Sequence, residues 1–422
     1  MRRVFIYTLI YNFLYLVLFP FILIYVFYGA IKNGKYRKGW KEKLTIEVPE
    51  RVEGKVLWVH AVSVGETILI VPIVAKIKEI VGEKVKIYFS TTTYTGNKVA
   101  KERLASCVER VFYFPIDFYP FVYRLFSKLN PDVIMVVETE IWPSLLYEAA
   151  RKKKRVYLVN GRISDRSFGR YLMLSFFFKP FLNFYKRAFV RSLSDKVRLM
   201  VLGMDEGRIT VTGNLKYYST LIQASNVRSA IVRDELMIDE KEKIVIFGST
   251  HPGEEEIVVW VIKELVKRGY KVIVAPRHPE RAMEVFNLIA GAELEVSLRS
   301  KGAFKGDVLV VDTIGELLKL YSISKFAVIG GTFVPVGGHN PLEPLCFSVP
   351  VIMGPYYNNF RDIVEYMKDF IYIVDSPLEI LETVERLSDK PVDWTKLLER
   401  LSSIANNVNL VIQEIVEDLL EE

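Results

Sequence analysis

Short apolar, β-rich runs alternate with helical patterns along most of the chain, and this alternation constrains the fold more than any other feature. Parallel strands are joined by crossovers, usually helices, so the pattern predicts parallel sheets covered on both faces. One series ends at Gly213 and another starts at Lys243. We therefore expect an α/β protein with two Rossmann-like halves. The expected strands are 55–60, 84–92, 110–114, 132–137, 155–160, 188–192 and 208–212, then 243–247, 271–274, 307–311, 326–329, 349–353 and 371–374.

Residues 4 to 31 contain no charged side chain. At ~1.5 Å per residue, such a helix exceeds the roughly 30 Å of bilayer hydrocarbon, and no cleavage site typical of a signal peptide is evident. We expect a single transmembrane anchor helix rather than a buried core hairpin. Cations dominate the segment that follows, so the positive-inside rule places the rest of the chain in the cytoplasm. They are Lys32, Lys35, Arg37, Lys38, Lys41 and Lys43, with Arg2 and Arg3 before the helix.

These patterns predict a domain organisation. The expected segments are an anchor helix over residues 1–31, a basic linker over 32–53, a Rossmann-like domain over 54–215, a connection over 216–242, a second Rossmann-like domain over 243–393 and a closing helix over 394–422.

Cations and aromatic residues interleave between residues 162 and 191. This combination suits an interface with anionic lipid, because apolar burial and charge attraction act together there. Nucleic acid would explain the cations but neither the anchor nor the dense phenylalanines. A long core helix with snorkelling ends is the structural alternative. The cations proposed for binding are Arg162, Arg166, Arg170, Lys179 and Lys186.

All four histidines fall in turns that follow expected strands, where open α/β sheets bind their ligands. No pair has metal-ligand spacing, and the motifs of serine hydrolases and phosphate-loop kinases are missing from the sequence. We expect no metal and no cofactor. The histidines are His60, His251, His278 and His339, and the two cysteines, Cys107 and Cys346, have no redox-like spacing.

The second half is equipped to hold a nucleotide without a metal. A glycine-rich stretch over 330–344 joins a strand to an expected helix that starts at Asn340 and Pro341. A plain strand-to-helix turn, with a capping box completed by Glu343, is the alternative. The groups suited to a nucleotide are the amides and hydroxyls of Gly248, Ser249 and Thr250, the Arg277 guanidinium for phosphate and the Glu343 carboxylate for ribose.

Two carboxylates in the first half are candidate general bases. Glu66 follows a glycine at the start of a helix, and Glu138 ends an apolar strand. Burial raises a carboxyl pKa and a helix N-terminus lowers it, so the net direction is open at this point. The spacing from Ser63 to Glu66 is also that of a capping box, and a carboxylate bonded to nearby amides is the alternative for Glu138.

Several motifs together resemble the bacterial Kdo transferases, the 3-deoxy-D-manno-octulosonic acid transferases of lipopolysaccharide synthesis. Their order and spacing match over nearly the whole chain. The motifs are WVHAVSVGE at 58–66, VETEIWP at 137–143, GNLK at 213–216, GSTHPGE at 248–254, PRH at 276–278 and GGTF at 330–333 with GGHNPLEP at 337–344.

The resemblance implies a GT-B glycosyltransferase, with two Rossmann-like domains facing across a cleft and a membrane anchor. It implies CMP-Kdo as donor, the lipid A precursor lipid IVA as acceptor, and the bacterial inner membrane as the location. Glu66 matches the family's base for an inverting displacement, and Glu138 matches a second acidic position. Lys216 and Asn340 join the donor group of Gly248, Ser249, Thr250, Arg277 and Glu343, and the basic aromatic segment becomes the acceptor dock.

Two other interpretations stay open. One is a membrane-associated GT-B enzyme that uses a UDP-sugar and a polyprenyl-linked acceptor. The other is a non-catalytic membrane protein that binds anionic lipid.

Overall fold

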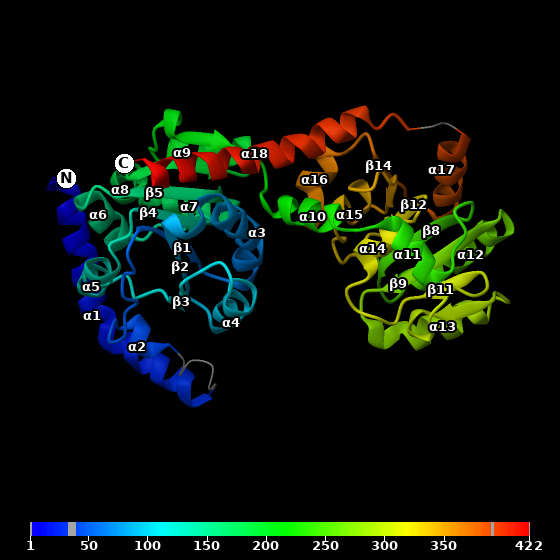
Figure 1. The fold of residues 1–422 in the computed structure, drawn as a ribbon, viewed down its shortest axis with the longest axis horizontal. Helices are drawn as coiled ribbons and strands as arrows, with labels where there is room; N and C mark the ends of the chain where they lie inside the picture. The colour runs from blue at the N-terminus through cyan, green and yellow to red at the C-terminus, as the bar shows by residue number, and fades with distance from the viewer. Residues whose placement is uncertain (1, 33–38, 390–391, 422) are drawn as a thin grey trace. The chain divides into compact units, whose positions relative to one another are not determined.

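The computed structural model describes residues 2–32, 39–389 and 392–421. The chain forms two compact units, Met1–Ser219 with Ile404–Glu422 and Thr220–Ser403, called here the first and second units. Each unit contains one seven-stranded sheet in which neighbouring strands run parallel (Figure 1). The expected α/β fold with two Rossmann-like halves is therefore confirmed.

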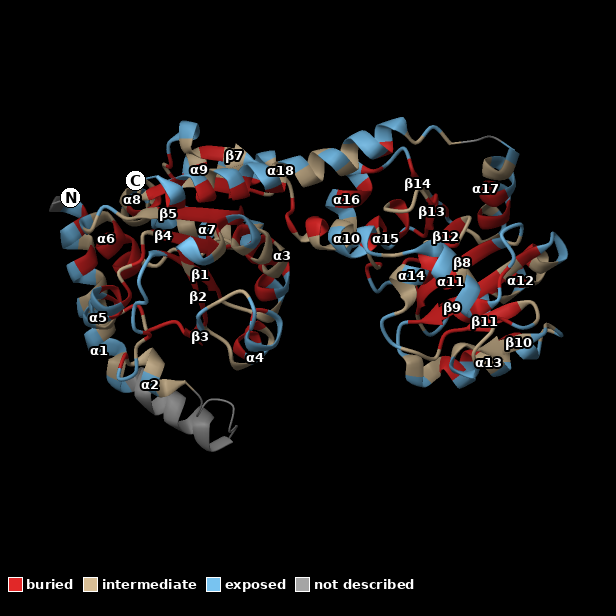
Figure 2. Cartoon of the chain, in the orientation of Figure 1, coloured by how far each residue is buried: buried red, intermediate tan, exposed pale blue. Residues whose placement is uncertain are grey.

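The first sheet has the strand order β3-β2-β1-β4-β5-β6-β7. Its strands are buried on both faces, as continuous runs of valine and isoleucine predict for parallel strands (Figure 2). Its strands are β1 Lys55–Ala61, β2 Val85–Thr91, β3 Arg110–Tyr113, β4 Val133–Val137, β5 Arg155–Gly161, β6 Tyr185–Val190 and β7 Ile209–Val211.

Helices cover both faces of this sheet. Leu57 and Val59 of β1 join a core with α3 and α18, whereas Val56 and Trp58 join a core with α5 and α6 on the other face. The helices of this unit are α1 Arg2–Lys32, α2 Trp40–Lys43, α3 Val64–Val81, α4 Tyr94–Arg103, α5 Tyr119–Leu129, α6 Pro143–Arg151, α7 Asp165–Met173, α8 Ser175–Leu182, α9 Leu193–Val201 and the later part of α18 Thr395–Leu420.

The second sheet has the order β10-β11-β9-β8-β12-β13-β14. Its strands are β8 Lys243–Thr250, β9 Tyr270–Pro276, β10 Val296–Leu298, β11 Val308–Val310, β12 Phe326–Ile329, β13 Val351–Met353 and β14 Ile371–Ile373. The helices here are α10 Lys216–Ser225, which starts in the first unit, α11 Ser229–Leu236, α12 Glu254–Lys267, α13 Ala282–Ala290, α14 Leu317–Tyr321, α15 Leu342–Leu345, α16 Arg361–Tyr366 and α17 Pro377–Asp389.

Helix α18 belongs to both units, because residues from Ile404 onward lie in the first. The Asp418 carboxylate is buried there, and it accepts a hydrogen bond from the Tyr157 hydroxyl at 2.7 Å. It also pairs with the Lys186 ammonium at 2.5 Å and the Arg155 guanidinium at 3.1 Å. These contacts hold the end of α18, the expected closing helix, against the first unit.

Three local expectations differ from the structure. The segment after residue 162 is not one long core helix, because α7 and α8 are short, separate helices and are followed by β6. Strand β10 is missing from the expected series because it is short and only half-buried. The connection over 216–242, expected to be partly helical, contains α10 and α11, but the division between units falls inside it, after Ser219.

Helix α1 covers the whole expected anchor. Within the described residues it is the single helix that is long and apolar enough to cross a membrane, over the window Arg3–Pro20. It runs along the outside of the first unit beside α6 (Figure 1).

Candidate functional site

The site in the first unit lies where the order of the sheet reverses. The chain passes outward from β1 through β2 to β3, and then returns to β4 on the other side of β1. In open α/β sheets, this reversal leaves a crevice at the carboxyl ends of the two central strands, where ligands bind. The turn that follows β1 carries Glu66, and the turn that follows β4 carries Glu138.

Glu66 is held rigidly in the first turn of α3. Its Oε2 accepts the backbone N–H of Val62 at 2.6 Å, and its Oε1 accepts the Ser63 hydroxyl at 2.8 Å. The Ser63 hydroxyl in turn accepts a hydrogen bond from the amide of Glu66, so the capping alternative is confirmed. In a standard capping box the glutamate side chain accepts the amide of the N-cap residue, whereas Glu66 accepts the amide of Val62, one residue before the N-cap Ser63. Burial raises the pKa of the Glu66 carboxyl more than these hydrogen bonds lower it, and the charge of Glu138 raises it further.

Glu138 and Glu140 complete a carboxylate cluster with Glu66. Glu138 has a backbone φ of 59°, an uncommon conformation for a residue with a side chain. Burial raises the pKa of Glu140 to about 7, and the charges of Glu66 and Glu138 act in the same direction. The structure therefore brings together both predicted carboxylates and a third, Glu140, which we missed. The sequence signal that could have identified Glu140 is its position two residues after Glu138.

His60 lies next to this cluster but belongs to the core. It is fully buried in β1, its Nδ1 is 2.9 Å from the Ser90 hydroxyl, and its ring stacks on Phe114 at 4.1 Å. Burial lowers its pKa to about 3, so it stays neutral. The expectation that all four histidines fall in turns after strands is wrong for this one, because His60 lies within β1.

The site in the second unit lies at the corresponding reversal, between β8 and β12. Two glycines allow the turns to approach closely. A Cβ added to Gly330 would overlap the backbone of Ser249, and one added to Gly248 would overlap the Tyr321 hydroxyl. Ser249 has a φ of 59°. The predicted groups of Gly248, Ser249 and Thr250 therefore end β8 at the centre of the sheet edge.

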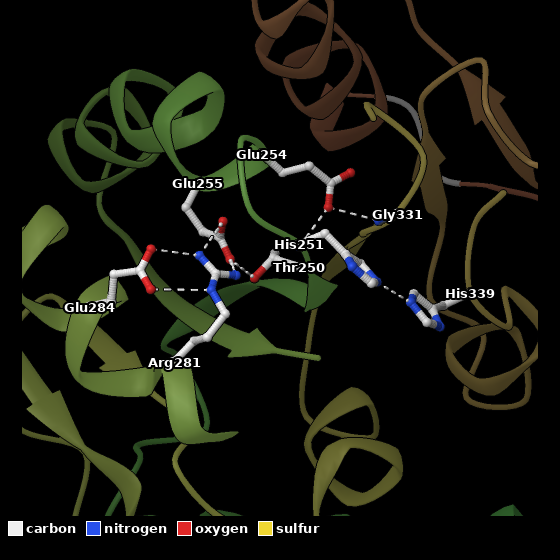
Figure 3. A network of polar contacts seen from close by, with 8 residues as sticks. All are labelled: Thr250, His251, Glu254, Glu255, Arg281, Glu284, Gly331 and His339. Atoms are coloured by element: carbon white, nitrogen blue, oxygen red, sulfur yellow. Dashed lines mark hydrogen bonds and ion pairs between the residues drawn. The ribbon is translucent and has the colours of Figure 1, made fainter. Parts of the chain in front are cut away.

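Glu254 ties the two turns together (Figure 3). Its buried carboxylate accepts four backbone N–H groups, at 2.7 to 3.0 Å. Burial raises its pKa, and these hydrogen bonds oppose that effect. Sequence reasoning missed this role, although the place of Glu254 in the first turn of α12 was a signal. The donors are the amides of His251, Gly331, Thr332 and Phe333.

A second network of side chains holds the turn that follows β8 (Figure 3). The Thr250 hydroxyl donates to the buried Glu255 carboxylate at 2.8 Å, and the Arg281 guanidinium pairs with that carboxylate at 3.0 Å. Arg281 also pairs with Glu284 at 3.0 Å. The position of Thr250 is thereby fixed by side chains of α12 and α13.

Histidines line the glycine-rich stretch. The Nε2 atoms of His251 and His339 lie 2.8 Å apart with their rings stacked, and the His278 ring is 6.2 Å from that of His251. Burial lowers the pKa of His339 to about 4 and also lowers that of His251, so both are neutral near pH 7. Neutral imidazoles present hydrogen-bonding nitrogens there without a charge.

Arg277 supplies the charge at this edge. Its side chain is exposed, and within the described part of the chain its guanidinium has no hydrogen bond or ion pair. Its charge lowers the pKa of Glu343, which burial raises more strongly. The Asn340 amide lies 3.3 Å from the Glu343 carboxylate. Arg277, Asn340 and Glu343 therefore lie close together, as predicted.

Glu343 does not complete a capping box, because α15 has only four residues and starts after Pro341. Instead, the side-chain oxygen of Asn340 accepts a hydrogen bond from the amide of Leu342 at 3.2 Å. The Glu343 carboxylate is therefore not used to close a helix turn.

Lys216 begins α10, whereas the other predicted donor residues belong to the second unit. Lys216 is in the first unit, its amide donates to the Asn214 side chain at 3.3 Å, and its ammonium lies 5.0 Å from the centre of the Tyr217 ring. The predicted acceptor cations are also divided. Lys186 is exposed but pairs with Asp418 of α18, whereas the other four are exposed in or near α7 and α8 and have no ion pair among the described residues. These four are Arg162, Arg166, Arg170 and Lys179.

Among the described residues, no group of three or more histidine, cysteine, aspartate or glutamate side chains is arranged to hold a metal ion. Metal independence stays a prediction.

Comparison with known proteins places these features in a family. A family model described as 3-deoxy-D-manno-octulosonic-acid transferase (kdotransferase) matches residues 38–219. A 3-deoxy-D-manno-octulosonic acid transferase of Chlamydophila psittaci is 30% identical over 368 residues, which cover 86% of this chain and 84% of the relative. A bifunctional glycosyltransferase/methyltransferase of Fusobacterium nucleatum is 33% identical over 91% of this chain, which spans only 63% of that relative.

A solved structure supports the fold alone. The UDP-GlcNAc 2-epimerase of Neisseria meningitidis, bound to UDP-GlcNAc, matches with a TM-score of 0.59 and 13% identity, over 86% of this chain and all of that one. Two parallel sheets with this connectivity agree with the GT-B class. The level of identity to the Chlamydophila relative over most of both chains shows that the protein is a glycosyltransferase of the 3-deoxy-D-manno-octulosonic acid transferase family.

Proposed function

We propose that the protein transfers Kdo from CMP-Kdo to a lipid A precursor, lipid IVA, by an inverting and metal-independent reaction at the cytoplasmic face of the inner membrane. The observation that carries this proposal is the carboxylate cluster of Glu66, Glu138 and Glu140 at the reversal of the first sheet. Membership of the family supplies the sugar. The cluster supplies a proton acceptor for the attacking hydroxyl.

Glu66 is the proposed general base. Its two hydrogen bonds occupy one acceptor position on each carboxylate oxygen, and each oxygen keeps a second position for the acceptor hydroxyl. Its raised pKa increases its proton affinity, and the neighbouring carboxylates disfavour loss of the captured proton. Attack on the anomeric carbon from the face opposite the leaving CMP inverts that centre.

The second unit is the proposed donor site. The Arg277 guanidinium pairs with the CMP phosphate, and the amides and hydroxyls of Gly248, Ser249 and Thr250 add hydrogen bonds. Glu343 and Asn340 accept and donate hydrogen bonds to the ribose. A fixed cation at the phosphate stabilises the charge that develops on the departing CMP, without a metal ion. Transfer requires this donor to reach the carboxylates of the first unit.

The proposed acceptor dock is the surface of α7 and α8. Arg162, Arg166, Arg170 and Lys179 are exposed there, and none has an ion pair among the described residues. Such cations suit the phosphates of a lipid A precursor, and exposed Met173 and its neighbours suit acyl chains. Lys186 is left out of this proposal because it pairs with Asp418.

The alternatives make different demands on the same residues. A UDP-sugar enzyme with a polyprenyl acceptor needs selectivity for UDP in the second unit. A non-catalytic lipid-binding protein needs no carboxylate cluster at all, and family membership as a glycosyltransferase disfavours it.

The reaction is tested by incubating the enzyme with CMP-Kdo and lipid IVA and weighing the products by mass spectrometry. We expect one or more Kdo units to be added. The Glu66→Gln variant should lose about 10²- to 10⁴-fold in rate, because the general base is removed, while its affinity for CMP stays unchanged. Glu79→Gln, at the exposed end of the same helix, is the matched control and should behave as wild type. Full turnover by Glu66→Gln would exclude this residue as the base.

Donor selectivity is measured by isothermal titration. CMP should bind and UDP should not, and Arg277→Ala should weaken CMP binding about 10- to 100-fold because a charge-assisted contact with phosphate is lost. Arg268→Ala is the control, since Arg268 pairs with Glu264 and Glu385. Binding of UDP without CMP would favour the UDP-sugar enzyme.

The pH dependence reports the carboxylate cluster. A base must be ionised, so the rate of the wild-type enzyme should fall as the pH drops through the pKa of Glu66, which burial and the charge of Glu138 raise above its ordinary value. Glu140 is protonated below about pH 7, so Glu140→Gln imitates its neutral form and should leave both the acid limb and the maximal rate nearly unchanged. Loss of rate at every pH would instead assign the proton acceptor to Glu140.

The acceptor dock is tested with the double variant Arg166→Ala and Arg170→Ala. Its KM for lipid IVA should rise about tenfold through loss of phosphate contacts, and its KM for CMP-Kdo should not change. Lys263→Ala is the control, because Lys263 is a partly exposed lysine of the second unit that pairs with Glu293. An unchanged KM for lipid IVA would place acceptor binding elsewhere.

A further inference from the structure

The N-terminal end of α1 is built into the first unit. Val4 is only 5% exposed and lies in the core with residues of α6 and α8. The Asn12 side-chain oxygen accepts the amide of Tyr119 at 2.6 Å, and its amide nitrogen lies 3.3 Å from the Ser144 hydroxyl. Lipid tails supply no such partners. Residues 4 to 12 are therefore held on the same side of any membrane as the catalytic carboxylates.

The chain that follows α1 returns to the same unit. The Glu42 carboxylate of α2 accepts the amide of Tyr113 at 2.9 Å, and the Lys43 carbonyl accepts the amide of Ile116 at 3.0 Å. Gly39 has a φ of 80°, and a Cβ there would overlap the Tyr113 ring. Gly39 is thus pressed against the unit.

The length of the chain decides whether α1 can cross a bilayer between these two attachments. From Asn12 to Lys32 the helix rises about 30 Å, which is just the thickness of the hydrocarbon core. The seven peptide steps from Lys32 to Gly39 span at most about 25 Å even when fully extended. If Lys32 lay on the far side, the chain could not return to Gly39. A crossing by α1 is therefore incompatible with both attachments.

The outward side of α1 is nonetheless strongly apolar. Its exposed apolar face consists of Phe5, Ile6, Leu9, Ile10, Phe13, Leu14, Leu16, Val17 and Leu18, which are 46% to 64% exposed. The surface continues onto α8, because Phe176 is 64% exposed and its ring lies 6.4 Å from that of Tyr7. Met173 at the end of α7 is 80% exposed. The exposed cations of α7 and α8 belong to the same two helices as Met173 and Phe176.

We propose that α1 lies in the plane of an anionic membrane surface, with its exposed apolar face in the lipid interface and both of its ends on the catalytic side. An apolar helix face with cations nearby has the chemistry of an interfacial anchor. The inference rests on the membrane location in the proposed function but not on the donor or the reaction. Asn12 meets the first turns of α5 and α6, at the sheet edge that also carries Glu138, so this edge is held at the lipid surface.

The sidedness of α1 is tested by cysteine labelling in membrane vesicles. In a background with Cys107→Ser and Cys346→Ser, a single cysteine is introduced as Arg3→Cys or, as control, Glu293→Cys, an 88% exposed position in the second unit. An impermeant maleimide should label both variants from the same side, in inverted but not in right-side-out inner-membrane vesicles. Labelling of the two from opposite sides would overturn the proposal.

Depth measurements remain decisive if lipid shields position 3. Spin labels are placed at Leu9, Phe13 and Val17 on vesicles of mixed zwitterionic and anionic phospholipid, and their accessibility to oxygen and to a polar relaxant is compared. An in-plane helix gives three equal, shallow depths, whereas a spanning helix separates Leu9 from Val17 by about 12 Å. A graded depth would overturn the proposal. Loss of vesicle binding by all three labelled variants, with Kdo transfer in detergent retained, would also overturn the proposal. That result would leave the proposed reaction intact.

Discussion

The shared direction of the strands decides where chemistry can occur in this protein. Because neighbouring strands in both sheets run parallel, their carboxyl ends meet at one edge of each sheet, and in each sheet the strand order reverses beside the first strand, β1 or β8. Side chains that are far apart in the sequence are brought together there. Glu66 and Glu138 meet in the first unit, and Ser249 and Gly330 meet in the second. The helices and loops elsewhere mainly hold these edges in place.

The two edges have opposite electrostatic characters. The first concentrates three carboxylates, and burial, together with the charges of neighbouring carboxylates, raises the pKa of Glu66 and raises that of Glu140 to about 7. The second presents the guanidinium of Arg277, which has no partner among the described residues, near two neutral histidines, while the Glu254 carboxylate accepts hydrogen bonds from backbone amides. An edge with raised proton affinity suits activation of a hydroxyl, and a cationic edge suits a phosphate leaving group. The electrostatic difference between the two edges follows from local burial and hydrogen bonding.

The sequence pattern predicted the two sheets and the turns of Glu66, Gly248 and Arg277, because strand periodicity and strand direction need no knowledge of distant contacts. Contacts between distant residues were not predictable. Glu254 binds amides 77 residues away, and Lys186 meets Asp418 across 232 residues. Nothing in the local pattern of 162–191 distinguishes Lys186 from the exposed arginines. Asn12 and Thr8, polar residues inside an apolar run, were local signs that α1 contacts protein.

The return of α18 to the first unit affects the order in which the molecule can be completed. Val408, Val411, Ile415 and Leu419 lie in the core on one face of the first sheet, together with residues of β1, β4 and β5. The second unit, by contrast, is one continuous stretch, Thr220–Ser403. On the ribosome, that stretch can close its core while one face of the first sheet still lacks its covering helix. The unit that is translated first is therefore finished last, and a chaperone has the longest opportunity to act on that face.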